Sequence, residues 1–169
     1  PNHLHRIVLC PQCHALQRKT GDIQGRESGC EKCGFRFWQQ AKEWNMPLFL
    51  WAYEAIDSQK KTIEGRVPDF TRPEKDYRAM KVGDVLKFCV VNANDGSRDQ
   101  SFPDMRLSVS FVHHYPTIEE MLQTEGIAKM VPQAKSIEEA VKVYLGFPGI
   151  PERLPKYGIC AIGLGERLL

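Results

Sequence analysis

The chain has 169 residues, enough for one ordinary domain or for a domain with a small module attached. Its fractions of hydrophobic and charged residues, 42% and 26%, are those of a globular protein, and its formal net charge of +2 is too small to imply a nucleic-acid partner by itself. The sequence has no apolar run near the roughly 20 residues that a membrane-spanning helix needs, so we expect no membrane partner.

The cysteines narrow the class of protein further. Of six cysteines, four form two close pairs, Cys10/Cys13 and Cys30/Cys33. Cys89 and Cys160 stand alone in apolar runs, where we expect buried and unreactive thiols. The disulfide framework of a secreted protein would not be expected to have this pattern in a chain long enough to form a core. We therefore predict an intracellular protein, with the cytoplasm and the mitochondrion as alternatives.

The spacing of the two pairs predicts a zinc ribbon over residues 1–44. Sixteen residues separate the pairs, which is within the range of four-cysteine zinc sites. Four thiolates complete a tetrahedron around the metal and leave no position for a reactive water, so the ion would be structural. We expect one Zn²⁺ to be bound by Cys10, Cys13, Cys30 and Cys33, and to supply much of the folding free energy of this short module. Redox use of the Cys-x-x-Cys pairs is the alternative.

A loop of the same module carries cations among polar residues. Arg18 and Lys19 lie in it, and aromatic residues follow the second cysteine pair at 35–38. Cations and aromatic rings together can bind phosphates and stack on bases, so Arg18 and Lys19 are candidate RNA contacts. The alternative is a solvated loop over a small aromatic core.

The sequence predicts a second domain over residues 47–169, which follows a connector at 41–45. A helix is expected over 51–59, and strands are expected over 62–67, 85–91, 105–115 and 157–164. Capping-box sequences at Thr117 and Ser136 predict the start of two more helices, and three prolines predict a loop over 146–155. We predict an α+β fold built on a small mixed barrel.

Residues 60–66, Lys-Lys-Thr-Ile-Glu-Gly-Arg, place three cations and a carboxylate within seven positions. In a strand over 62–67, Thr62, Glu64 and Arg66 would share one face, because side chains alternate along a strand. That polar face would border a cleft, while Ile63 and Val67 would enter the core. The alternative is a half-exposed strand with a surface ion pair, which contributes little to stability.

The order of these features resembles the ASCH domain family over roughly residues 48–165. The resemblance rests mainly on Lys-Thr-Ile-Glu-Gly-Arg at 61–66 and on Gly-Asp at 83–84. It implies a PUA-like β-barrel, a fold shared with several RNA-binding domains. It also implies a cleft beside the Lys/Glu/Arg strand for RNA or a nucleoside.

Some small ASCH proteins that this chain resembles are amidohydrolases of acetylated cytidine. The resemblance implies a catalytic lysine at Lys61, a threonine nucleophile two residues before Arg66, and a glutamate after the following helix. Glu64 occupies the position of the threonine, which removes the ready acyl acceptor. Thr62 lies two positions earlier, and Glu125 is the nearest candidate for the glutamate.

Two adjacent histidines on the expected strand over 105–115 are further titratable candidates. Neighbouring residues of a strand face opposite sides, so at most one of His113 and His114 can enter a given cleft. We expect one of them to be packed in the protein and the other to be solvated.

Three hypotheses follow. The first is an RNA-binding protein of a ribonucleoprotein particle such as a (mitochondrial) ribosome, with other proteins of that assembly as partners. Glu64 would orient Arg66 or accept from a base edge. The phosphates would be bound by cations of this region, namely Lys60, Lys61, Arg66, Arg72, Lys75 and Arg78. The second is an amidohydrolase of a modified nucleoside such as acetylcytidine, with Lys61 and Glu64 as acid/base groups. The third is a structural docking protein with no ligand in the cleft.

Overall fold

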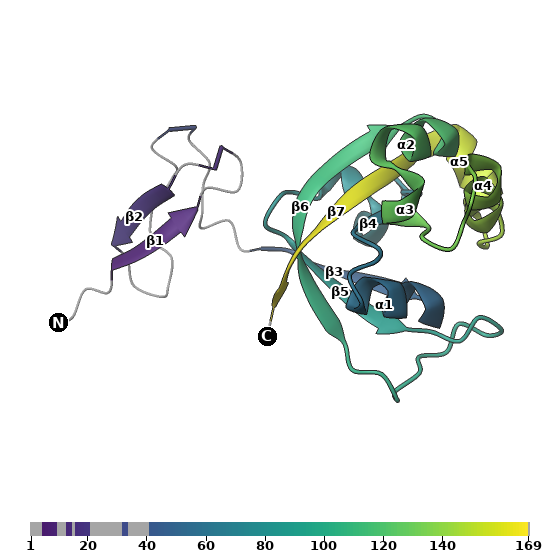
Figure 1. The fold of residues 1–169 in the computed structure, drawn as a ribbon, viewed down its shortest axis with the longest axis horizontal. Coiled ribbons are helices and arrows are strands. Elements are labelled where there is room, and N and C mark those ends of the chain that lie inside the picture. The colour runs from purple at the N-terminus through teal and green to yellow at the C-terminus, as the bar shows by residue number, and fades with distance from the viewer. Residues whose placement is uncertain (1–4, 10–12, 15, 21–31, 34–40, 169) are drawn as a thin grey trace. The chain divides into compact units, whose positions relative to one another are not determined.

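The computed structural model describes residues 5–9, 13–14, 16–20, 32–33 and 41–168. The chain divides into two compact units, Pro1–Lys42 and Glu43–Leu169. In the first unit, β1 (His5–Leu9) pairs with β2 (Leu16–Thr20) in an antiparallel sheet (Figure 1).

The predicted zinc site cannot be followed through this unit. Cys10 and Cys30 lie outside the described residues, while Cys13 and Cys33 lie in described turns. Within the described ranges no three His, Cys, Asp or Glu side chains gather as metal ligands, and two of the four cysteines lie outside those ranges. The zinc ribbon therefore stays a prediction.

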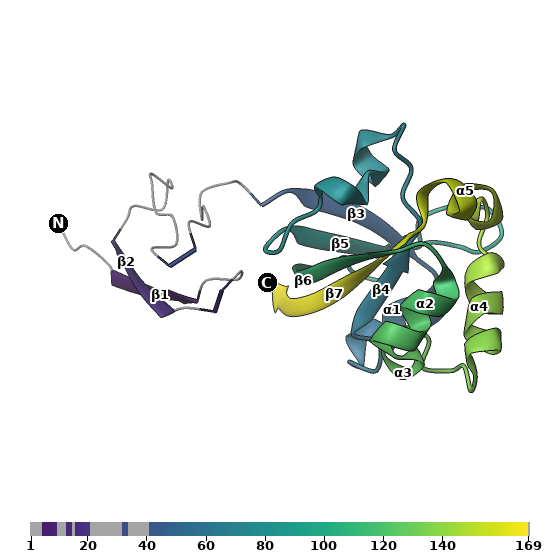
Figure 2. The same cartoon turned by 90° about the horizontal axis from the view of Figure 1, so that it is seen from above.

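The second unit is a mixed α and β fold around a curled five-stranded sheet, with strand order β3-β5-β6-β7-β4 (Figures 1 and 2). The strands β3 and β5 are parallel, and the other neighbouring pairs are antiparallel. The sheet curls into the form of half a barrel, which confirms the α+β class and the barrel-like character predicted from the sequence. The strand bounds are β3 (Glu43–Leu48), β4 (Ile63–Arg66), β5 (Val85–Val90), β6 (Met105–Tyr115) and β7 (Ile159–Leu168).

Five α-helices and two short 3₁₀ helices connect these strands in the described part of the unit. Their bounds are α1 (Leu50–Asp57), α2 (Ile118–Glu125), α3 (Ile127–Met130), α4 (Ile137–Leu145), α5 (Ile150–Tyr157), η1 (Pro73–Lys75) and η2 (Tyr77–Ala79). The predicted caps of α2 and α4 are confirmed, because the hydroxyls of Thr117 and Ser136 each accept a backbone N–H three residues later at 3.2 Å. None of the described helices has the length and apolar character needed to cross a bilayer.

Two hydrophobic clusters hold the unit together, and β7 takes part in both. Cys160 and Ile162 belong to the cluster that includes residues of β3, β5, β6 and α1. Ile159 and Ala161 belong to the cluster that includes residues of β4 and of α2 to α5. Successive side chains of a strand point to opposite faces of the sheet, so one strand supplies both clusters.

Residues 43–45 were predicted as a connector, but they begin strand β3. Trp44 and Met46 are fully buried and alternate with exposed neighbours, and the indole Nε1 of Trp44 donates to Asp84 Oδ2 at 2.9 Å. Pro47 also fits this strand, because β3 is at the edge of the sheet, where a residue without an N–H is tolerated.

The loop predicted over 146–155 is also wrong, because helix α5 begins at Ile150. Pro151 lies in the first turn of α5, where the backbone N–H has no helical partner in any case. Pro155 lies inside the helix and removes one backbone bond, which a helix of eight residues tolerates here. The last strand consequently begins at Ile159, two residues later than predicted.

Candidate functional site

A cavity of about 270 Å³ lies beside β4. Its wall combines residues of β3, β4, α1, α4 and α5 with the segments that follow β4. Most of these side chains are apolar or aromatic, which is typical of ligand-binding cavities, where a few polar groups fix the ligand. The charged residues of the wall are Lys61, Glu64, Arg66, Lys75 and Arg153.

Three of these residues form a buried ionic cluster. Lys61 is 3% exposed and Glu64 is 6% exposed. The Lys61 Nζ lies 3.2 Å from Glu64 Oε2, and Arg66 Nε donates to Glu64 Oε1 at 2.8 Å. Arg66 Nη2 also donates to the Pro47 carbonyl at 2.6 Å, which links β4 to β3. The predicted pairing of Glu64 with Arg66 is present, with Glu64 buried and Arg66 half-buried instead of both lying on the surface.

The ammonium of Lys61 has no donor left for a ligand. It donates to the backbone carbonyls of Ile63 at 2.9 Å and Met130 at 2.5 Å, and it pairs with Glu64. An ammonium has three N–H donors, so these three acceptors use all of them. Lys61 thus fastens the start of β4 to the end of α3 and has a structural role in this geometry.

The charges of the cluster shift the pKa values of its members. Burial lowers the pKa of Lys61 below its ordinary value of 10.5, and the attraction of Glu64 opposes that effect only in part. Burial alone would raise the pKa of Glu64, but the charges of Lys61 and Arg66 and their hydrogen bonds outweigh it and bring the pKa below 4.5. With Glu64 ionised, two cations share one carboxylate and the cluster carries a net charge of +1.

Two buried polar atoms in the cavity wall have no hydrogen-bond acceptor within the described part of the protein: the Tyr144 hydroxyl, whose oxygen lies near the Gly65 backbone N–H, and Arg153 Nε. Tyr144 is 3% exposed, and burial raises the pKa of its hydroxyl far above the usual range, so the proton stays in place. Its ring lies over Gly65, where an added Cβ would come 2.4 Å from the hydroxyl oxygen. Leaving a buried donor without an acceptor costs about 1–3 kcal/mol, so both atoms favour a ligand that would supply acceptors.

Aromatic rings make up much of the remaining wall. Phe49 and Phe147 lie with ring centroids 5.4 Å apart, and Tyr144 meets Phe147 edge-on at 6.2 Å. Trp51 and Tyr77 also line the cavity. A flat ring in this cavity could stack on these aromatic side chains, in the way that nucleic-acid bases stack on aromatic residues in many binding sites.

The structure brings together four of the predicted site residues, namely Lys61, Glu64, Arg66 and Lys75. Three predicted cations are exposed and lie outside the cavity wall: Lys60, Arg72 and Arg78. Arg72 pairs with Glu74 and Arg78 pairs with Asp76, both at 2.7 Å. Arg18 and Lys19 were predicted in a loop, but their backbone lies in strand β2, so that part of the prediction is wrong; their side chains are outside the described part of the chain.

Thr62 does not share the cavity face with Glu64 and Arg66, contrary to our prediction. The strand β4 begins only at Ile63, so the alternation does not extend back to Thr62. Thr62 is exposed and lines a different hollow, together with residues that include Asp57 and Arg167. It therefore cannot replace the missing threonine nucleophile in this geometry.

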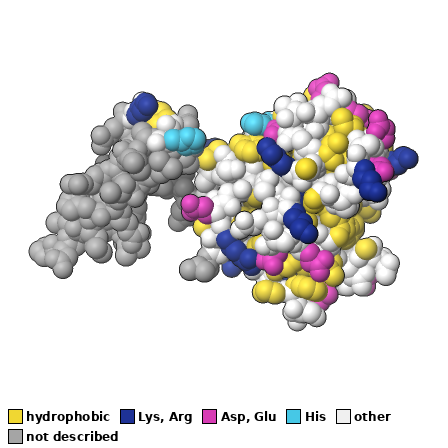
Figure 3. All heavy atoms as spheres, viewed as in Figure 1, with side chains coloured by type: hydrophobic (Ala, Val, Ile, Leu, Met, Phe, Trp, Pro, Cys, Tyr) yellow, Lys and Arg dark blue, Asp and Glu magenta, His cyan; other side chains and the backbone are white. Residues whose placement is uncertain are grey.

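Exposed cations do not gather into a broad patch on the face of the larger unit shown in Figure 3. Lys and Arg side chains there are scattered among acidic, apolar and other polar ones. A negatively charged partner that bound this face would contact separate cations and not a continuous basic surface.

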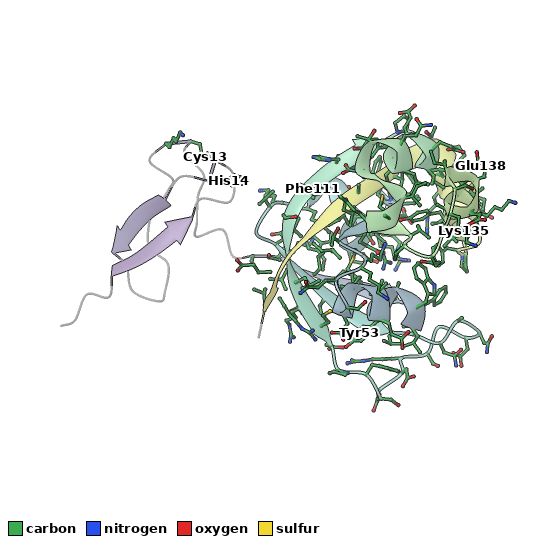
Figure 4. The ribbon with its side chains drawn as sticks, viewed as in Figure 1. Cys13, His14, Tyr53, Phe111, Lys135 and Glu138 are labelled. Atoms are coloured by element: carbon green, nitrogen blue, oxygen red, sulfur yellow. The ribbon has the colours of Figure 1, made fainter. Side chains whose placement is uncertain are left out.

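Glu125 and the two histidines lie away from the cavity. Glu125 Oε1 accepts from the Tyr115 hydroxyl at 2.6 Å and lies 2.5 Å from His113 Nδ1. The His113 ring stacks on Phe111 of β6, which is labelled in Figure 4. Both histidines are exposed, so the prediction of one packed histidine is wrong.

The two isolated cysteines differ in burial. Cys160 is fully buried as predicted, and burial raises the pKa of its thiol to about 12, although its Sγ lies 3.2 Å from His114 Nδ1. Such a thiol is a poor nucleophile. Cys89 is half-buried, so the prediction of a buried thiol is wrong for that residue.

Sequence reasoning missed Tyr144 and Arg153, which provide the two buried polar atoms without an acceptor in the described structure. Tyr144 was assigned only to the apolar face of its helix, and Arg153 lay in the segment predicted as a loop. The one available signal was the position of Tyr144 on the buried face of α4, which placed a hydroxyl in the interior.

No family model and no curated protein matches the chain. Solved structures do match it, and two of them are described below. The first is the hypothetical protein PH0355, which is 36% identical, with a TM-score of 0.57 and coverage of 75% of this chain and 99% of PH0355. The chain belongs to the family of PH0355. A second structure of similar fold, protein PF0455 from Pyrococcus furiosus, is 35% identical, with a TM-score of 0.52 and coverage of 75% of this chain and 97% of PF0455. The names of PH0355 and PF0455 indicate no ligand or activity.

Proposed function

We propose that this chain is an RNA-binding protein with a zinc ribbon and an ASCH-type, PUA-like barrel, and that the cavity beside β4 takes one nucleoside of the RNA. The observation that carries the proposal is the buried hydroxyl of Tyr144, which has no acceptor in the described structure, in a cavity walled by aromatic rings. The volume of about 270 Å³ suits one small planar ligand. The ring faces would stack on a base, and the hydroxyl would donate to it.

The hydrogen-bonding groups of the cavity also support a ligand rich in acceptors. A guanidinium has five N–H donors, and Arg66 uses two of them, one on Glu64 and one on Pro47. Three donors remain on a side chain that is 20% exposed. Base carbonyls, ring nitrogens and phosphate oxygens are all acceptors, so an RNA ligand matches these groups.

The charges of the wall support the same ligand. Four cationic side chains and one carboxylate line the cavity, an excess of three positive charges. Phosphates of an RNA strand would be attracted to this opening although the net charge of the whole chain is only +2.

The test is the affinity of the full chain for fluorescently labelled single-stranded RNA, measured by anisotropy over a range of salt concentrations. We expect the dissociation constant to rise with salt, with a logarithmic slope of about 0.7 for each phosphate contacted. Because the cations on the face shown in Figure 3 are scattered, we expect contacts to only a few phosphates on that face. Binding that does not respond to salt would remove the phosphate contacts from the proposal, and no binding to any RNA would refute it.

An amidohydrolase is the second candidate, and its support is the Lys61–Glu64–Arg66 segment inside a nucleoside-sized cavity. Two observations count against it. The Lys61 ammonium has all three donors engaged, and both oxygens of Glu64 are held by cations. Release of acetate from acetylcytidine by the purified protein would favour this candidate over binding alone. A docking protein with an empty cleft is the third candidate, favoured if neither RNA nor nucleoside binds.

The zinc ribbon and the assembly into a ribonucleoprotein particle such as a ribosome are parts of the same proposal. Four cysteines at the spacing of a zinc ribbon support the metal. We expect one zinc per chain in elemental analysis of the full-length protein, lost in a Cys10→Ser, Cys30→Ser variant. Native protein that sediments alone and carries no RNA would argue against membership of a particle.

A further inference from the structure

Two cations of the cavity wall are not part of the ionic cluster around Glu64. Lys75 ends η1, and Arg153 lies in the first half of α5, so they come from elements far apart in the sequence. Both line the same cavity. Burial first, and then the positive charges of Arg72 and Arg153, lower the pKa of Lys75, which places Lys75 and Arg153 within electrostatic reach of each other.

Neither of these cations forms an ion pair within the part of the chain that the structure describes. Exposed arginines nearby in the sequence do: Arg72 pairs with Glu74 and Arg78 pairs with Asp76. The carboxylate of Asp69 interacts electrostatically with Arg153 and Lys75 but forms no ion pair with either in the described structure. It accepts the backbone N–H and the hydroxyl of Thr71 at 3.0 and 2.6 Å.

Arg153 also has a buried donor without an acceptor in the described structure. Its Nε is fully buried and donates to no described acceptor, while its guanidinium lies 3.5 Å from where a Cβ on Gly149 would be. A guanidinium presents donors in a planar fork that matches the oxygens of phosphate. A buried donor of that kind, beside a lysine, is suited to an anion that brings several acceptor oxygens.

We propose that Lys75 and Arg153 form an anion subsite of the cavity and that the group bound there is the phosphate of a nucleotide. This inference rests on the proposed function, because it assumes that Tyr144 and the aromatic wall hold the nucleoside. It adds that the nucleoside must carry a phosphate to bind well, either as a monomer or as a unit of an RNA strand. A free nucleoside leaves the donors of Arg153 and Lys75 without acceptors.

The test compares each of the four ribonucleosides with its 5′- and 3′-monophosphates by titration calorimetry on the full chain. We expect at least one monophosphate to bind about tenfold more tightly than its nucleoside, the effect of one charge-assisted hydrogen bond. Arg153→Gln and Lys75→Gln should each remove most of this advantage and leave the affinity for the nucleoside within about twofold. Arg98→Gln is the control, because Arg98 is exposed, pairs with Asp104 and lies outside the cavity wall, and it should change neither affinity.

Binding of a short oligoribonucleotide shows whether the bound phosphate belongs to an RNA strand or to a free nucleotide. If the strand is the source, Arg153→Gln should weaken oligonucleotide binding and reduce its salt slope by about one phosphate. Nucleoside and nucleotide that bind equally, or an Arg153→Gln variant that weakens both equally, would overturn the subsite and leave the proposed function intact. If RNA, nucleosides and nucleotides all fail to bind, the proposed function is refuted and the subsite with it. Circular dichroism of each variant verifies that the fold is retained.

Discussion

Glu64→Gln is the substitution that most directly tests the buried cluster. The chain supplies a matched control in Glu74→Gln. In each case the arginine and the glutamate are two residues apart, and arginine Nε donates to Oε1 at 2.8 Å. The pairs differ in burial: the side chains of Glu64 and Arg66 are 8% and 20% exposed, whereas those of Glu74 and Arg72 are 60% and 51% exposed.

The difference in burial predicts very different losses of unfolding free energy for the two variants. Glutamine at 64 would leave Lys61, whose side chain is 2% exposed, with two carbonyl acceptors and no counter-ion, and the cluster would carry a net charge of +2. Breaking a buried pair in this way costs about 3–5 kcal/mol of unfolding free energy. Exposed pairs contribute about 0–1 kcal/mol, so Glu74→Gln should be close to neutral.

The assay is urea unfolding of the full chain, followed by circular dichroism and by tryptophan fluorescence. The unfolding free energy and its dependence on urea are fitted for the wild type and both variants. We expect Glu64→Gln to lower the midpoint strongly with an unchanged urea dependence. If the unfolding free energies of the two variants lie within about 1 kcal/mol of each other, the buried cluster stabilises the fold no more than an exposed ion pair does.

Three further predictions use the same protein. The folded-state pKa of Glu64 lies below its ordinary value of 4.5, so the contribution of the Glu64 carboxylate to stability is complete above pH 4.5 and is lost as the pH falls through the folded-state pKa. Acid should therefore destabilise the wild type more steeply than Glu64→Gln, when the unfolding free energy is measured against pH. Tyr144→Phe should weaken RNA binding with little loss of stability, because the lost O–H donates to no acceptor in the described structure. Tyr53→Phe should cost about 1 kcal/mol and leave binding unchanged, because that hydroxyl donates to Pro103 at 2.9 Å outside the cavity. The reverse pattern in calorimetry and thermal unfolding would contradict the role given to Tyr144. Gly65→Ala should lower the unfolding free energy by about 1–3 kcal/mol, since its Cβ would come 2.4 Å from the Tyr144 hydroxyl, and an unchanged melting temperature would show that the ring moves aside freely.

The parts of the fold that the sequence predicted well are those determined by local patterns. Strand β6 was predicted with its observed bounds from alternating apolar residues, and α2 and α4 were predicted from their capping residues. In each case the signal lies within about ten neighbouring residues. Segment 60–66 lies beside the cavity as predicted, and its signal was also local, because the three members of the cluster are close in sequence.

The missed parts depend on contacts between distant segments. Trp44 gains its buried place from pairing of β3 with β5 and from Asp84, forty residues later. Helix α5 forms in spite of its prolines, and only its packing brings Arg153 to the cavity. Tyr144 meets Gly65 across almost eighty positions. Periodicity in a single segment has no information on such pairings, so the sequence predicted one side of the cavity and not the other.

The sharing of β7 between the two hydrophobic clusters has a consequence for how this unit unfolds. Its alternating side chains complete both clusters, so neither can keep its packing when this strand leaves the sheet. The two clusters should therefore be lost in one cooperative event, with no stable intermediate that retains only one of them. Occupation of the cavity, which is lined from both clusters, would then stabilise the whole sheet and not only the helices around the ligand.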